Sequence, residues 1–184
     1  AQRGSLFGVA DEGGWWPDFS SNEQALEMLV LAIERAGFIP GDQVAIALDI
    51  AASEFGRQGQ YRLGLESRAL DSDGMIEMLL RWVEKYPIVS IEDPLAEDDS
   101  VGFARFTKAI GHRLQIVGDD FLVSNSSLIR EAAKLGAANT VLLKPNQRGT
   151  LSETLEAWKV AQELGYSAIV SARSGETEDT TIVD

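Results

Sequence analysis

Short apolar runs alternate along the chain with longer segments in which apolar residues recur every three or four positions. The longer segments predict amphipathic helices, and the short runs between them predict buried strands. The predicted strands are 44–49, 88–92, 114–118, 139–144 and 167–171. The predicted helices are one between Ser21 and Gly37, and others at 74–86, 98–110, 125–135 and 151–164.

This alternation of strand and helix with short connections requires a parallel sheet covered by helices. A (β/α)8 barrel of the TIM type and an open doubly wound sheet both satisfy it. We favour the barrel because several strands end in charged residues, and barrel sites are assembled from the ends of many strands. No GxGxxG motif marks the switch point of an open sheet. Five strands do not close an eight-stranded barrel, so we expect residues 1–184 to represent only part of such a barrel.

Two segments depart from the regular pattern. Residues 1–21 are rich in glycine and are predicted to be loop-like, whereas apolar and polar residues alternate around Gly59 in residues 53–65 and predict a small excursion or a hairpin. The sequence also predicts how some helices begin and end. The expected caps are Ser21 for the first helix, Asp71 or Ser72 for the second, and Gly136 at the end of the fourth.

Three apolar runs lead directly into acids, which are Asp49, Glu92 and Asp119. Because the carboxyl ends of parallel strands meet at one face, we expect these carboxylates to converge as hard oxygen ligands for Mg²⁺. Any one of them is explained equally well as a cap of the following helix, but their recurrence on three successive strands favours a metal site. Asp93 and Asp120, their neighbours, are predicted to hold the ligands or a lysine in place.

Lys144 ends the fourth predicted strand, where we expect it to lie beside the acids and partly out of water. It can then act as a general base or form a salt bridge to one acid, and the pattern leaves both open. Glu12, in a glycine-rich stretch, is a candidate acid or base on a lid. Arg173 and Ser174 are candidate anion ligands, with an ordinary polar loop as the alternative.

The formal net charge of −13 argues against a nucleic-acid partner, because phosphate backbones are bound by clustered Lys and Arg. A small phosphorylated substrate needs only a few local cations and remains compatible with this charge. The chain has no cysteine, which excludes disulfides and fits a cytoplasmic protein. No apolar run reaches the roughly 18 residues of a transmembrane helix, so we expect no membrane span.

Six longer stretches resemble, in order, the motifs of one enzyme family. They are ADEGGWWP, ALDIAASEF, PIVSIEDPLAEDD, VGDDFLVSN, LLKPNQRGTLSETLEA and SARSGETEDTTI. The chain resembles enolase, the phosphopyruvate hydratase of glycolysis, over nearly its whole length. Several long motifs in the same order make the resemblance highly specific, and it implies the middle and later part of the enolase barrel domain.

Enolases remove water from 2-phosphoglycerate to form phosphoenolpyruvate through an enolate intermediate, with two Mg²⁺ ions. The resemblance therefore implies a lyase that binds a small phosphorylated carboxylic acid, and we expect a cytoplasmic homodimer. By motif match, the implied residues are the metal ligands Asp49, Glu92 and Asp119, the base Lys144, the general acid Glu12, and the phosphate ligands Arg173 and Ser174.

Two positions depart from the family pattern. Ala172 stands where the family's Ser-His-Arg-Ser-Gly-Glu loop has a histidine of the substrate pocket, and Pro145 replaces a usual valine, which could re-aim Lys144. Two further functions therefore stay open beside dehydration of 2-phosphoglycerate. One is action on a different phosphorylated or phosphonate carboxylic acid. The other is a catalytically weak binding or assembly protein, against which the intact lysine and acids argue.

Overall fold

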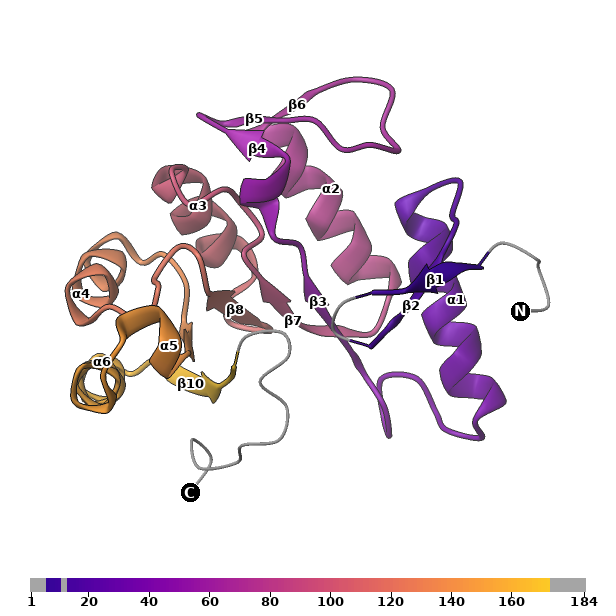
Figure 1. Ribbon diagram of the computed structural model, residues 1–184. Coiled ribbons are helices and arrows are strands. Elements are labelled where there is room, and N and C mark those ends of the chain that lie inside the picture. The colour runs from indigo at the N-terminus through magenta and orange to yellow at the C-terminus, as the bar shows by residue number, and fades with distance from the viewer. Residues whose placement is uncertain (1–5, 11–12, 173–184) are drawn as a thin grey trace.

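The computed structural model describes residues 6–10 and 13–172, and its main feature is a five-stranded parallel sheet (Figure 1). The strands lie in chain order, and each pairs in parallel with the next. Sequential parallel order is the arrangement of a TIM-type barrel, so the predicted α/β barrel class is confirmed and the described strands form part of such a barrel. The strands are β3 (Ile46–Asp49), β7 (Ile88–Glu92), β8 (Gln115–Gly118), β9 (Thr140–Leu143) and β10 (Ser167–Val170).

Helices precede, connect and cover these strands. In Figure 1, α2, α3, α4 and α6 follow one another along an arc outside the sheet, and neighbours in this series are in contact. The core fills the space between helices and sheet, where Leu79, Phe103, Phe106, Ile116 and Ile129 are fully buried. Among the described residues, no helix is long and apolar enough to cross a bilayer. The helices are α1 (Asn22–Arg35), α2 (Ser72–Lys85), α3 (Ser100–Ile110), α4 (Ser126–Leu135) and α6 (Leu151–Glu163).

The helix ends use the predicted capping residues. The side chains of Ser21 and Asp71 accept hydrogen bonds from backbone N–H groups in the first turns of α1 and α2. Gly136 ends α4 with a φ of 68°, a left-handed conformation that glycine adopts without a steric penalty. Local capping chemistry and hydrophobic periodicity thus point to the same helix bounds.

The prediction of loop structure throughout residues 1–21 is wrong. β1 (Leu6–Val9) and β2 (Trp15–Pro17) form an antiparallel pair. The Ala10 N–H donates to the Gly14 carbonyl and the Gly13 N–H donates to the Ala10 carbonyl, both at 2.8 Å. Gly13 has a φ of 82°, so here a glycine that indicated a loop serves the turn between two strands.

The hairpin predicted around Gly59 is confirmed, and a third short strand extends it into a small antiparallel sheet. Tyr61 anchors this sheet and is fully buried. Its hydroxyl donates to Asp99 Oδ2 at 2.8 Å and accepts from the Ala96 N–H at 3.1 Å, in the connection after β7. Burial, followed by the Asp99 carboxylate, raises the pKa of Tyr61. The three strands are β4 (Gly56–Arg57), β5 (Gln60–Tyr61) and β6 (Leu70–Asp71).

The strands of the parallel sheet are less uniformly buried than their apolar runs predicted. β9 is buried at all four positions. In contrast, β3 exposes Ala47 and Asp49, and β10 exposes Ala168 and Val170. These two strands are the edges of the sheet within the described residues and have a neighbouring strand on one side only. Full burial therefore holds only for β9. The central strands β7 and β8 each have an exposed residue, Val89 and Gln115, and the prediction is wrong for the two edge strands.

Candidate active site

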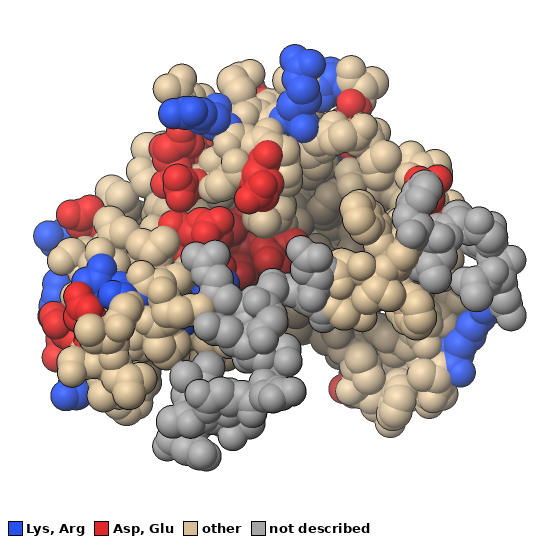
Figure 2. Space-filling view, in the orientation of Figure 1, with Lys and Arg blue, Asp and Glu red and all other residues tan. Residues whose placement is uncertain are grey.

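The three acids predicted as metal ligands lie at the same edge of the parallel sheet. Asp49 and Glu92 are paired residues at the ends of β3 and β7. Glu92 also pairs with Val117 of β8, which places Asp119 just beyond the end of the next strand. Figure 2 shows acidic side chains gathered in the middle of the face in view. The acids come from three consecutive strand ends, as barrel sites do.

These acids also perturb one another electrostatically. Burial, followed by the negative charges of Asp49 and Asp119, raises the pKa of Glu92 to about 8, and Lys144 opposes the shift. Asp49 lies on an edge strand and is exposed, but loss of solvation still raises the pKa of its carboxyl. The negative charge of Asp119 raises this pKa further. A bound cation would relieve this mutual repulsion.

Asp93 holds the backbone that carries Asp119. It is buried and has a φ of 40°, an uncommon conformation for a residue with a side chain. Its Oδ1 accepts the Asp119 N–H at 3.0 Å and its Oδ2 accepts the Asp120 N–H at 2.8 Å. Burial raises the pKa of Asp93 to about 7, although these two N–H groups act in the opposite direction. The carboxyl of Asp93 therefore fixes the loop after β8.

Among the described residues, Asp93, Asp119 and Asp120 bring one oxygen atom each within 4.8 Å of one another. Such a set of hard oxygen donors suits Mg²⁺. It differs from the predicted set of Asp49, Glu92 and Asp119. Because both oxygens of Asp93 already accept backbone N–H groups, that residue is better suited to support than to coordination. Asp119 is common to both sets.

Lys144 follows β9 directly and caps the short helix α5 (Pro145–Arg148). Its Nζ lies 2.5 Å from Asp119 Oδ2, and the two side chains are only 14% and 12% exposed. The salt bridge that the sequence left open is therefore present, and it places the amine beside the acids. Pro145 occupies the first turn of α5, where a missing N–H costs nothing, and it does not turn Lys144 away from the acids.

The end of β8 is shaped by Gly118. A Cβ at this position would lie 2.6 Å from Cγ of Leu122, which packs against the strand end. The Asp119 carbonyl accepts the N–H groups of Leu122 and Val123 at 3.1 and 2.7 Å. Asp119 thus sits at the start of a tight turn, so its side chain leaves the sheet in a defined direction.

Two further polar residues contact this site, and the sequence analysis missed both. Gln147 Nε2 donates to Asp119 Oδ1 at 2.7 Å. The Ser124 hydroxyl donates to Gln147 Oε1 at 2.8 Å. Gln147 comes three residues after Lys144, which is about one helical turn. A search for polar residues at this spacing from the candidate base could have identified it. Ser124 lies in a turn with positive φ, which its residue type does not indicate.

The remaining predicted site residues lie at or beyond the end of the described chain segments. Glu12, Arg173 and Ser174 fall outside the described residues. Ala172 is half-buried. The preceding N–H, of Ser171, donates to the Leu143 carbonyl at 2.9 Å and extends the ladder between β9 and β10. Ala172 therefore follows the strand next to that of Lys144, at the same edge of the sheet.

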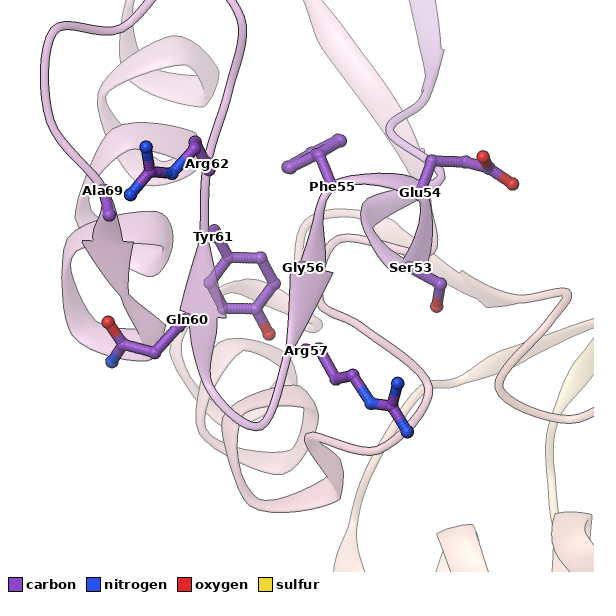
Figure 3. A pocket seen from close by; sticks show the side chains of 9 residues that line it. All are labelled: Ser53, Glu54, Phe55, Gly56, Arg57, Gln60, Tyr61, Arg62 and Ala69. Carbon is purple, nitrogen blue, oxygen red and sulfur yellow. The ribbon is translucent and has the colours of Figure 1, made fainter.

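A separate open hollow of about 560 Å³ lies against the small antiparallel sheet (Figure 3). Its lining includes Arg57 and Arg62, but the two guanidinium groups point away from each other in this view. None of the predicted site residues lines it. The hollow offers no convergent charged groups, so the strand-end acids remain the candidate site.

A comparison with known protein families finds a match that spans nearly the whole chain. The family model described as "Enolase, C-terminal TIM barrel domain" matches residues 2–184. Every residue discussed at the strand ends falls within the matched range.

Proposed function

The chain belongs to the enolase family, and on this premise we propose that it carries the site of a Mg²⁺-dependent lyase that dehydrates 2-phosphoglycerate to phosphoenolpyruvate. Membership in the enolase superfamily, which includes this family, indicates an enzyme of the lyase or racemase type. The strongest support for the proposal is the ion pair between Lys144 and Asp119 at the strand ends. A lysine held there beside Glu92 has the position that a base acting next to a substrate carboxylate requires.

Lys144 is the proposed base. In its neutral form, the Nζ lone pair takes the proton from the carbon next to the substrate carboxylate, and the electrons of the broken C–H bond move toward that carboxylate. Asp119, 2.5 Å away, then stabilises the ammonium group that has formed.

Asp49, Glu92 and Asp119 are the proposed Mg²⁺ ligands. Their oxygen atoms suit a hard cation. Burial, followed by the negative charges of Asp49 and Asp119, raises the pKa of Glu92. A Mg²⁺ ion held by these three carboxylates would supply positive charge that stabilises negative charge on the substrate carboxylate. Asp93 keeps Asp119 in place through the backbone. Enolase-superfamily sites are themselves a standard example of a lysine or histidine base that works beside Mg²⁺.

Glu12 is the proposed general acid that assists departure of the hydroxyl group, and Arg173 and Ser174 are the proposed phosphate ligands. These three roles rest on the family motifs. Support comes from Ala172, which precedes Arg173 and lies at the same sheet edge as Lys144.

The direct test measures phosphoenolpyruvate formation, by ultraviolet absorbance, from 2-phosphoglycerate and Mg²⁺ with the complete protein. A second readout follows exchange of the substrate's C2 hydrogen with D₂O by NMR. We expect both activities in the unmodified protein and neither in Lys144→Met. Absence of both from the unmodified, folded protein at saturating Mg²⁺ would refute the proposal.

One observation favours a second candidate function. Ala172 has no group that can donate a hydrogen bond, and it occupies the position of a pocket histidine in the motif. A site that lacks one polar partner loses discrimination for substrates that need it. A related phosphorylated or phosphonate carboxylic acid is therefore the alternative substrate. Competition assays with such acids, scored by C2 exchange and turnover, separate the two candidates.

A further inference from the structure

The candidate base and its partner acid belong to a closed ring of hydrogen bonds. The backbone N–H of Lys144 donates to Ser124 Oγ at 2.8 Å. The Ser124 hydroxyl donates to Gln147 Oε1 at 2.8 Å, and Gln147 Nε2 donates to Asp119 Oδ1 at 2.7 Å. Asp119 Oδ2 accepts from Lys144 Nζ and closes the ring. Both ends of Lys144, its backbone and its amine, are therefore tied to one network.

The direction of each hydrogen bond in this ring is fixed by chemistry. The Asp119 carboxylate only accepts, so the amide of Gln147 must turn its NH₂ group toward it. The Gln147 oxygen then faces Ser124 and accepts the hydroxyl proton. This leaves a lone pair of Ser124 Oγ for the backbone N–H of Lys144. A side chain that lacks either the donor or the acceptor of Gln147 cannot complete the ring.

The ring also joins three elements that the chain brings together from different places. Ser124 lies in the turn before α4, is fully buried and has a φ of 52°. Lys144 directly follows β9, and Gln147 lies in α5. The Ser124 hydroxyl also lies 3.3 Å from the Leu142 carbonyl, so Ser124 has little freedom to move. Because Ser124 is buried and held in place, it fixes the position of the hydrogen-bond ring.

We propose that Ser124 and Gln147 are positioning residues that set the orientation of the Asp119 carboxylate and of Lys144 together. Each carboxylate oxygen of Asp119 has one partner in the ring, which fixes the plane of the group and directs its remaining lone pairs. Mutation of a residue that hydrogen-bonds to a metal ligand commonly reduces metal affinity or activity by about 10- to 100-fold. This inference rests on the proposed function for its catalytic part, whereas the orientation of Asp119 is testable with Mg²⁺ alone.

The test compares Gln147→Met with the matched control Gln162→Met in the complete protein. Methionine has a similar length but cannot make these hydrogen bonds, and Gln162 is an exposed residue of α6. Calorimetric titration with Mg²⁺ in the absence of substrate should show affinity reduced by about tenfold or more for Gln147→Met. The control should stay within about twofold of the unmodified protein, as surface substitutions usually do. With substrate, kcat should fall for Gln147→Met while KM for the substrate changes little.

A double-mutant cycle tests whether the ring acts as a unit. Once Gln147→Met has opened the ring, Ser124→Ala should reduce Mg²⁺ affinity less than it does alone. Additive effects would overturn the proposal, as would Mg²⁺ affinity and kcat in Gln147→Met that match the control. Should Ser124→Ala not fold, the comparison of Gln147→Met with its control decides. If the unmodified protein binds Mg²⁺ but does not act on 2-phosphoglycerate, the proposed function fails while the titrations still decide the role of the ring.

Discussion

Replacing Glu92 with glutamine tests the electrostatics of the candidate site most directly. Glu92 has a pKa raised to about 8, first by burial and then by the charges of Asp49 and Asp119. Glu92→Gln keeps the size of the side chain and removes its charge. We expect the fold to be retained, and we expect Mg²⁺-dependent activity to be lost because the proposed metal loses one carboxylate ligand.

The raised pKa defines how stability should depend on pH without Mg²⁺. In the unfolded chain Glu92 ionises near its ordinary pKa of 4.5, whereas in the folded protein it keeps its proton up to about pH 8. The folded state therefore binds the extra proton, and its stability falls as pH rises through the folded pKa. Between pH 7 and pH 9 this one group should lower the free energy of unfolding by about 1 kcal/mol.

The assay is chemical denaturation of both proteins across this pH range, in chelator. The difference in free energy between Glu92→Gln and the unmodified protein should grow by about 1 kcal/mol from pH 7 to pH 9, in favour of the variant. Taking the difference removes most of the contribution of Asp93, whose pKa of about 7 affects both proteins. Parallel curves would show that Glu92 ionises normally and would refute the reasoning.

Mg²⁺ provides a second readout of the same protonation. A carboxylate must lose its proton to bind a metal, so Mg²⁺ binding at pH 7 should release close to one proton from Glu92. Calorimetry in two buffers of different ionisation enthalpy measures this release. Glu92→Gln should release correspondingly fewer protons at saturating Mg²⁺. Equal proton release by the two proteins would remove Glu92 from the proposed ligand set.

Three further outcomes test neighbouring residues. Lys144→Met should abolish C2 hydrogen exchange, and a variant that still exchanges this hydrogen would contradict the role of Lys144 as base. The same change leaves the little-exposed Asp119 without its cation, so chemical denaturation should show the metal-free fold destabilised by about 3 kcal/mol. Asp93→Asn should destabilise by about 1–3 kcal/mol, because one of two backbone N–H groups loses its acceptor, and unchanged stability would contradict the support role. Ala172→His should raise kcat/KM for 2-phosphoglycerate about tenfold if one transition-state hydrogen bond is restored. No gain would count against the hypothesis that Ala172 alters the substrate pocket.

The strand ends could be predicted from the sequence because two simple patterns coincide there. An apolar run of strand length marks the element, and the acid or lysine that ends it marks the edge of the sheet. Asp49, Glu92 and Lys144 follow from this rule, and the structure places all three at one edge. The β1–β2 pair could not be predicted in the same way. Glycine-rich composition is common to loops and to tight turns, and strand pairing depends on a partner that local sequence does not specify.

The support beneath the candidate site was harder to predict because it contradicts local preference. Asp93 and Ser124 have φ angles of 40° and 52°, a region that a glycine would occupy more easily. Such conformations cost roughly 1–3 kcal/mol each and persist where other contacts stabilise them. At both positions the side chain makes hydrogen bonds that glycine could not, to the backbone of Asp119 in one case and to Gln147 in the other. The strain is thus located where an acid and a hydroxyl group are needed to orient Asp119, and this requirement depends on three elements meeting in space.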